Sequence, residues 1–408
     1  MIASSSSTQA CRHQPPRIEA IDAVRGLAMV LMALDHLRDF LFHAIDIDPT
    51  DLNQTYPLLF MTRWISHLCA PTFIFLAGTS IYLSMAKGKS RASMSIFLIK
   101  RGLWMIFLEL LVIRSIGWFF NFDYHYLPAW VIWVLGWSML LLAALIHWPR
   151  KWIACVSLIC IFGHNLFDTW VTPQRSAWTW LGVTLHESEA LIIPAFRPFW
   201  NEPIEWNAGY PLIPWVAVMA LGYVAGPIFM YERSKRRRTL IVVGLLAMVL
   251  FVGIRWSQRY GEPQPWVKFD DLRWTMMSFL NCTKQPPSLA FLLMTLGPAC
   301  LLLGLWDREP AYPWCRVLCT YGRVPLFYYL LHLPLIHGLA LVLSRWQTGT
   351  FQTWLFQNPP GFFERNGYGV DLIGVYGAWV GVLLLMYPMC SWYGRIKQTY
   401  RISWLSYL

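Results

Sequence analysis

Residues 17–43 have the sequence RIEAIDAVRGLAMVLMALDHLRDFLFH, and this stretch decides the fold. It is long enough to cross the hydrocarbon core of a bilayer as one α-helix, which takes about 20 residues. At 100° per residue, six of its side chains fall near one face of such a helix: Asp22, Arg25, Met29, Met32, His36 and His43. Ionisable groups in a spanning helix must face protein, water or ligand, so we expect this helix inside a bundle.

Nine further apolar segments of about spanning length follow along the chain. The ten expected spans cover residues 18–42, 59–85, 97–118, 127–147, 152–167, 211–230, 240–256, 289–306, 318–344 and 370–393. Apolar residues make up 56% of the 408, and charged residues only 13%, against roughly 25% charged residues in soluble proteins. We therefore expect an all-α, polytopic integral membrane helical bundle with about ten transmembrane helices.

Charges in the connections predict the orientation of these helices. The loops after the second, fourth, sixth and eighth spans are rich in Lys and Arg, as in KGKSRASMSIFLIKR and YERSKRRR, whereas the other loops are richer in Asp and Glu. Basic loops stay on the cytoplasmic side, so both termini are expected there. The net charge of +11 follows from this topology and requires no nucleic-acid partner. We expect a disordered cytoplasmic tail over 1–16, a membrane domain over 17–395 and a cytoplasmic tail over 396–408.

Other sequence features narrow the class of protein. The N-terminal residues MIASSSSTQACRHQPP lack the apolar segment of a signal peptide, so no cleavage is expected. Most of the nine cysteines lie in apolar runs, which predicts no disulfide framework, and no His and carboxylate group has zinc-ligand spacing, so we expect no metal. The long external loops 168–210 and 257–287 are rich in Trp and Pro. They either anchor the protein at the interface or form a lid or floor for a polar ligand such as a sugar.

The candidate site residues lie in the first, second and ninth expected spans. His36 stands well inside the first span, where an imidazole is a candidate general base or nucleophile. His67 is expected at a similar depth in the second span, with Arg63 four residues before it. Asp35 adjoins His36, but neighbouring side chains of one helix diverge, so another helix must orient the ring. In the ninth span, His332 is expected near the midplane.

The same residues also have interpretations in which their roles are purely structural. Asp22 and Arg25 have the spacing of an i,i+3 ion pair at the cytoplasmic end of the first span. In the same interpretation, the charged residues at the outer end of this span have satisfied partners: Asp35, Arg38 and Asp39. His332 and His337, five residues apart in the ninth span, are more often packing or hydrogen-bonding residues than ligands.

Five motifs together resemble a known family. They are RIEAIDAVRGLAMVLMALDH, APTFIFLAG, GYPLIPWVAVMALGY, KQPPSLAFLLMTLGPA and YGRVPLFYYLLHLPLIH. They are similar to the motifs of the bacterial membrane acyltransferase family related to heparan-α-glucosaminide N-acetyltransferase, within the transmembrane acyltransferase superfamily. In that superfamily an Arg, ten residues and a His recur, and Arg25 and His36 match this spacing.

The resemblance implies acyl transfer, most simply acetyl transfer, from cytoplasmic acetyl-CoA to an extracytoplasmic carbohydrate at a bacterial inner membrane. It implies that His36 is catalytic and Arg25 belongs to the donor path. In the lysosomal branch an Asn occupies the His36 position, and His43 or His67 is the alternative here. We select His36, His67 and Asp35 as candidate catalytic residues, and Arg25, Arg323 and His332 as candidates for binding the donor, with Arg101 as a further cation. A proton-coupled solute transporter is the alternative function, and homo-oligomerisation is left open.

Overall fold

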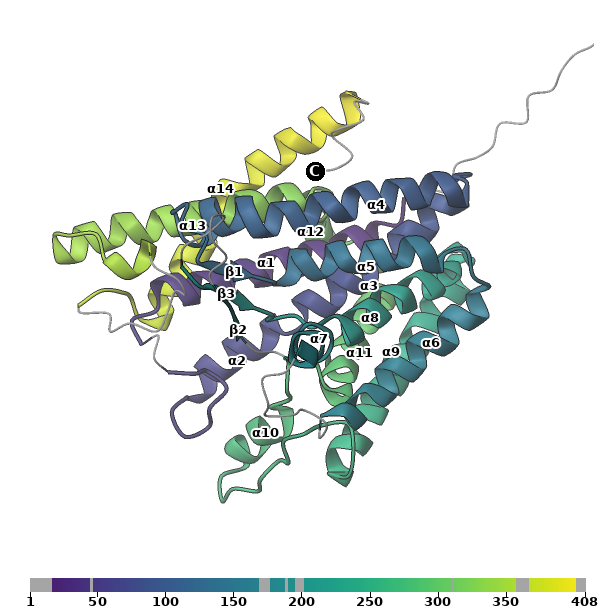
Figure 1. Cartoon of the computed structure of the whole chain (residues 1–408). Helices are drawn as coiled ribbons and strands as arrows, with labels where there is room; N and C mark the ends of the chain where they lie inside the picture. Colours follow the sequence, from purple (N-terminus) through teal and green to yellow (C-terminus); the bar gives the residue numbers. More distant parts are fainter. Residues whose placement is uncertain are drawn as a thin grey trace, which may run out of the picture.

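The computed structural model describes residues 17–44, 47–168, 177–187, 190–194, 202–309, 311–356 and 367–400. It is a bundle of helices with one small sheet drawn between α1 and α2 in the view of Figure 1. Its α-helices are α1 (Glu19–Leu41), α2 (Pro57–Ser66), α3 (Cys69–Ala86), α4 (Arg91–Phe107), α5 (Val131–Leu145), α6 (Arg150–Gly163), α7 (Ala177–Leu185), α8 (Leu212–Ala225), α9 (Arg233–Ser257), α10 (Leu272–Leu280), α11 (Leu289–Trp306), α12 (Pro313–Gly322), α13 (Pro325–Thr348) and α14 (Leu372–Thr399).

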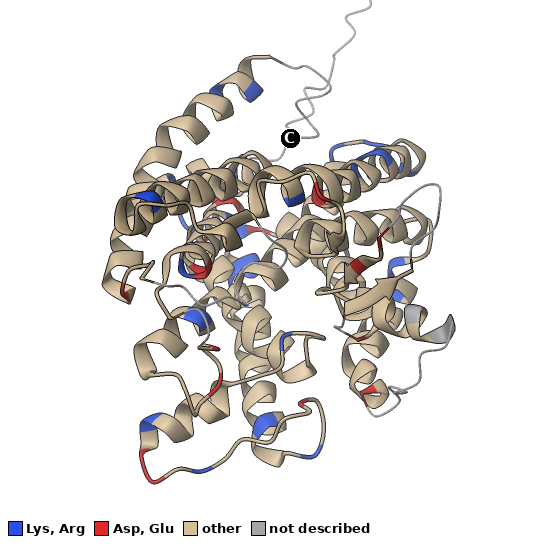
Figure 2. Ribbon diagram, turned by 60° about the vertical axis from the view of Figure 1, so that its left-hand side comes forward, with Lys and Arg blue, Asp and Glu red and all other residues tan. Residues whose placement is uncertain are grey.

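Four π- and 3-10 helical elements in the described part of the chain extend or connect these helices. They are the π-helix η1 (Leu108–Trp118) and the 3-10 helices η2 (His164–Phe167), η3 (Gly226–Met230) and η4 (Thr353–Phe356). Each of the ten segments expected to span the membrane contains a helix. Among the described residues, six helical stretches are long and apolar enough to cross a membrane, 57–86, 212–230, 233–257, 289–306, 325–348 and 372–399. Long stretches of helix carry no charged residue (Figure 2). The all-α membrane bundle is therefore confirmed.

Three features differ from the sequence-based expectation. A three-stranded sheet of order β1-β3-β2 joins β1 (Tyr126–Pro128), β2 (Ala190–Ile193) and β3 (Ile204–Asn207), with β1 parallel and β2 antiparallel to β3. The second expected span divides into α2 and α3, and the ninth begins inside α12. The expected C-terminal tail begins inside α14, which ends at Thr399. Residues 1–16 of the expected N-terminal tail lie outside the described part of the chain.

The centre of the bundle is α1, which packs against α2, α3, α11, α12, α13 and α14. The backbones of α1 and α12 approach closely, because a glycine on each helix leaves no side chain between them. A Cβ added at Gly26 of α1 would lie 1.9 Å from the carbonyl oxygen of Leu318, and one added at Gly322 would lie 1.9 Å from that of Asp22. Small residues that let backbones approach are typical of helix interfaces in membranes. These two glycines bring the N-terminal half of α1 against the end of α12.

Candidate active site

Two histidines from distant parts of the chain meet inside the bundle. His36 of α1 and His332 of α13 lie with Nδ1 of the first 2.8 Å from Nε2 of the second. His332 is fully buried, whereas His36 is partly exposed. Both residues were candidates on sequence grounds, for different roles, and they are in direct contact.

The backbone of α13 fixes which nitrogen carries the proton in each ring. Nδ1 of His332 lies 3.0 Å from the carbonyl oxygen of Tyr328 and 2.9 Å from that of Tyr329. A carbonyl oxygen only accepts, so this nitrogen must donate. In a neutral His332, Nε2 then accepts, and Nδ1–H of His36 is its donor. A neutral His36 consequently has an unprotonated Nε2, which is the form that a general base requires.

Aromatic rings surround the exposed part of this histidine pair. The ring of Trp118, the last residue of the π-helix η1, stands edge-on to His36 with centroids 5.0 Å apart. Tyr329 of α13 stands edge-on at 6.4 Å. Long π-helical segments are rare and often occur at functional sites. Here η1 ends where its last side chain contacts the His36 ring.

Asp35 belongs to an ion-pair network on the other side of α1. Its carboxylate pairs with Arg63 of α2 and with Arg38 at 3.2 Å, and Arg38 also binds Asp39 at 2.5 Å. This arrangement matches the interpretation in which the outer charges of α1 have partners in ion pairs, while Oδ1 of Asp35 and Nε of Arg38 are buried without a hydrogen bond among the described residues. The hydrogen bonds of the His36–His332 pair therefore do not involve Asp35, and its selection as a catalytic candidate stays a prediction.

The other candidate histidines lie apart from the pair. His67 follows α2, is buried, and packs on Phe291 with ring centroids 5.3 Å apart. His43 lies beyond the end of α1, is exposed, and its Nδ1 is 3.1 Å from the carbonyl oxygen of Val370. His337 is a packing residue: its Nδ1 donates to the carbonyl of Gly117 at 3.0 Å. The first two expected spans are adjacent in the bundle, because α1 contacts both α2 and α3.

A cavity of about 330 Å³ leads toward the histidine pair from the end of the bundle that holds the basic loops. Met29, Met32 and Leu135 contribute to its largely apolar wall, and Tyr329 also lines it. Because Tyr329 contacts His36, the cavity reaches the neighbourhood of that ring. Five cationic side chains line the same cavity: Arg25, Lys89, Arg101, Arg323 and Lys397. The geometry suits a long ligand with an anionic end and an apolar arm.

Arg25 and Arg323 are held by different contacts at the end of the bundle that holds the basic loops. Arg25 donates to Ser80 Oγ of α3 at 2.8 Å and lies 3.7 Å from the Asp22 carboxylate. Arg17 forms the closer ion pair with Asp22. The Arg323 guanidinium lies 3.9 Å from Asp22 and from Glu19. The predicted Asp22–Arg25 pair is therefore loose, and Arg25 lines both the cavity and a wider recess of about 870 Å³.

Sequence reasoning missed several residues of this site. Trp118 and Tyr329 were not selected, because an aromatic residue in a spanning helix gives no signal until its neighbours are known. Lys89 and Lys397 were counted only as charges of basic segments. The motif PLFYYLLH contains Tyr329 and His332, so an i,i+3 pairing of aromatic and imidazole rings was the one signal that pointed to this part of α13.

A comparison with protein-family models matches residues 17–257 to the heparan-alpha-glucosaminide N-acetyltransferase catalytic family. The matched range includes Arg25, His36 and His67, whereas Arg323 and His332 follow it. A comparison with curated protein sequences finds no match. The last two motifs that carried the resemblance, around Lys284 and Tyr321, lie beyond residue 257, and their helices α11, α12 and α13 pack directly on α1.

The hydrogen-bond chain predicts one tautomer for both rings. In protein labelled with 15N-histidine, His36 and His332 should show a protonated Nδ1 and an unprotonated Nε2 at neutral pH. Solid-state NMR distinguishes the tautomers, and the H36Q and H332Q variants assign the signals. A protonated Nε2 on a neutral His36 would contradict the proposed orientation of the pair.

Proposed function

The chain belongs to the heparan-α-glucosaminide N-acetyltransferase catalytic family, and from this premise we propose that it transfers an acetyl group across a membrane. In this proposal the donor is cytoplasmic acetyl-CoA and the acceptor is a hydroxyl or amine of an extracytoplasmic sugar. The observation that carries the proposal is the position of the His36–His332 pair beside Tyr329, which lines the cavity with the cationic mouth.

The cavity supports acetyl-CoA as the donor. Coenzyme A carries phosphate groups at one end and a thioester on a flexible, weakly polar arm at the other. Cationic side chains bind phosphates through charge-assisted hydrogen bonds, and Arg25, Arg101 and Arg323 would supply them at the mouth. The apolar wall around Met29, Met32 and Leu135 would take the arm. Its volume falls within the range of ordinary ligand sites, about 300–1,000 Å³.

The histidine pair supports direct transfer. Nε2 of His36 takes the proton of the acceptor hydroxyl or amine as the acceptor oxygen or nitrogen bonds to the thioester carbon. The tetrahedral intermediate then collapses, the C–S bond breaks, and the thiolate of coenzyme A takes the proton from His36. His332 acts as a positioning residue, because it holds the His36 ring in the tautomer that this step needs. The same exposed nitrogen would serve a two-step route in which His36 first carries the acetyl group.

The outer side of α1 offers polar contacts for an acceptor. Lys284, which belongs to the KQPPS motif, interacts electrostatically with Asp35, His36 and His67. Its ammonium lies 5.9 Å from the ring centroid of Tyr210. Sugars are bound by combinations of polar groups and aromatic rings, so this group of side chains suits a carbohydrate on the extracytoplasmic side. The expected positions of both termini in the cytoplasm belong to this proposal.

His36 is the expected base, and its variants test the assignment. H36A should lower acetyl transfer by about 10²–10⁴-fold, the usual contribution of a general base. H43A should retain near-normal turnover, because the His43 ring is exposed and contacts Val370 at the outer end. H67A is the critical comparison, because His67 is the alternative candidate for the catalytic base. Each variant is measured for CoA release that depends on an added glycan, after its expression and thermal unfolding are matched to those of the natural protein.

Normal turnover of H36A together with inactive H67A or H43A would overturn the assignment of the base. Glycan uptake without release of CoA would instead favour the transporter alternative. H332A should reduce turnover less than H36A and should leave the affinity for the donor unchanged, because His332 lies behind the His36 ring and does not line the cavity.

Among the residues proposed to bind the donor, Arg25 is the one whose substitution tests the donor path best. The R25Q variant should bind a nonhydrolysable acetyl-CoA analogue about 10–100-fold more weakly, since a hydrogen bond to a charged group is worth about 1.5–3 kcal/mol. R273Q is the matched control, because Arg273 is exposed and pairs with Asp271 near α10. Titration calorimetry measures both affinities. Unchanged affinity of folded R25Q would remove Arg25 from the donor path.

A further inference from the structure

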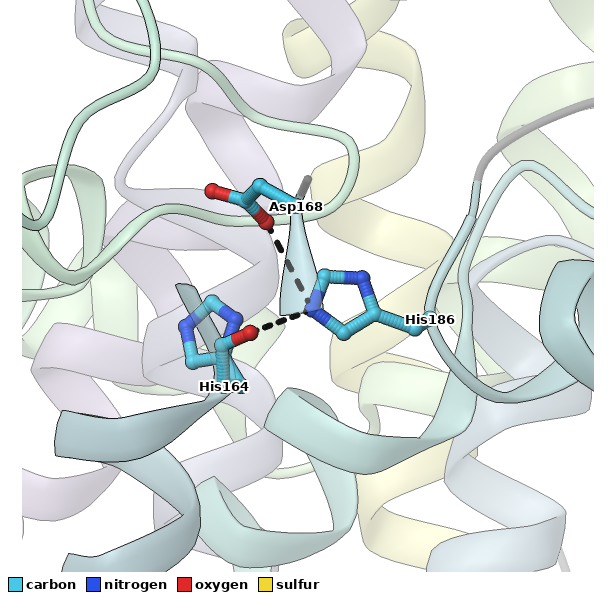
Figure 3. Close-up of side chains that lie close together, drawn as sticks. All are labelled: His164, Asp168 and His186. Atoms are coloured by element: carbon cyan, nitrogen blue, oxygen red, sulfur yellow. Dashed lines mark hydrogen bonds and ion pairs between the residues drawn. The ribbon is translucent and has the colours of Figure 1, made fainter. Parts of the chain in front are cut away.

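Three potential metal ligands converge away from the His36 site. His164 is the first residue of η2, Asp168 follows that element, and His186 directly follows α7. One ligand atom from each lies within 4.8 Å of the others. Figure 3 shows the His186 ring turned toward both the Asp168 carboxylate and the backbone of His164. The group thus joins the end of α6 to the end of α7.

Three buried polar atoms of this group have no hydrogen-bond partner among the described residues. His164 is 1% exposed, and neither of its ring nitrogens has a hydrogen-bond partner among the described residues. Within the same part of the chain, Oδ1 of Asp168 is also buried without a hydrogen bond. Leaving a buried polar group unsatisfied costs about 1–3 kcal/mol. Two imidazole nitrogens and a carboxylate oxygen are ligands that Zn²⁺ accepts.

We propose that His164, Asp168 and His186 bind a divalent transition-metal ion of the zinc type, which ties the extracytoplasmic end of α6 to that of α7. The separation of 3.5 Å between His186 Nε2 and Asp168 Oδ1 is close to the edge of a tetrahedral zinc site, about 3.4 Å for ligand bonds near 2.1 Å. The His164 nitrogen lies within 4.8 Å of the other two ligand atoms, and a rotation of its ring would have to bring it closer to the ion. Water completes the fourth position.

One existing contact must change when the ion binds. Nε2–H of His186 donates to the carbonyl oxygen of His164 at 2.7 Å, and a metal ligand needs that nitrogen unprotonated. The proton therefore moves to Nδ1 of the same ring, which leaves the charge of His186 unchanged. The hydrogen bond to the carbonyl is exchanged for the bond to the metal.

A neighbouring amide already orients the carboxylate. Nδ2 of Asn165 donates to Oδ2 of Asp168 at 2.8 Å, and Oδ1 of Asn165 accepts from the backbone N–H of Leu289 at 3.0 Å. Hydrogen bonds of this kind fix metal-binding carboxylates. Through Asn165 the site is linked to the first residue of α11. The ion would therefore fix the external connection after α6 against α11, and it would act independently of the acetyl-transfer proposal.

This proposal replaces the sequence-based expectation of no metal. The two histidines are separated by 21 intervening positions in the chain, so no short zinc pattern marks them. Asp168 lies four residues after His164, but an aspartate at that spacing is common and gave no signal by itself. The three residues come together only because α7 folds back toward the end of α6.

Zinc binding to the full-length protein in detergent tests the proposal. The protein is purified through a tag that contains no histidine, treated with a chelator and titrated with ZnCl₂ by calorimetry. One ion per chain is expected. H164A and H186A should weaken binding by more than the roughly 10–100-fold that loss of a supporting hydrogen bond causes. H125A is the matched control, because His125 also lies 3.5 Å from an aspartate, Asp123, without a second histidine.

A second readout covers variants that fail to fold. D168N changes a partly exposed side chain and should remain folded; Zn²⁺ should raise the unfolding temperature of the natural protein and of H125A but not that of D168N. The visible absorption of bound Co²⁺ reports a tetrahedral site in the natural protein. The proposal is overturned if the natural protein binds no stoichiometric ion, or if H164A, H186A or D168N binds it as tightly as H125A.

Discussion

The ionisable side chains of α1 need partners inside the bundle, because a charged group at the centre of a membrane costs about 2.5–3.5 kcal/mol on insertion scales. Its ionisable side chains have such partners: Asp22 is bound by Arg17, Arg25 by Ser80, Asp35 by Arg63 and His36 by His332. These partners come from several elements, so the requirement draws α2, α3 and α13 around α1. The glycine contact with α12 completes the enclosure at the N-terminal end of α1.

The same requirement separates the two ends of the proposed reaction path. Arg25 and His36 lie eleven residues apart on α1, which is about 16 Å along the helix axis. Arg25 reaches the cavity at its cationic mouth, and Tyr329 connects the cavity wall to His36. An anionic head group near Arg25 and a reacting carbonyl near His36 would therefore be separated by about half the length of α1. This spacing gives a physical reason for the Arg–ten residues–His pattern.

Much of the bundle was predictable from the sequence, because lipid imposes the length and apolarity of each span. All ten expected segments contain helices, and α1 occupies the interior as its charges indicated. The β1-β3-β2 sheet could not be predicted, since its strands are three or four residues long and separated in the chain. The local features of His36 marked it as a candidate. Its contact with His332, which is 296 positions away, depends on how α1 and α13 pack and left no local pattern.

Acetyl transfer across a sealed bilayer tests the central claim most directly. Proteoliposomes are prepared with a panel of hexose and hexosamine glycans enclosed, and radiolabelled acetyl-CoA is supplied outside. Transfer is scored for the vesicles in which a protease added outside cleaves the 87–91 loop, because the basic loops face outward in these vesicles. The account predicts label on an enclosed glycan, matched by release of CoA outside and absent with H36A. Label that appears only when the donor and the glycan share one side, or no label on any glycan, would contradict it.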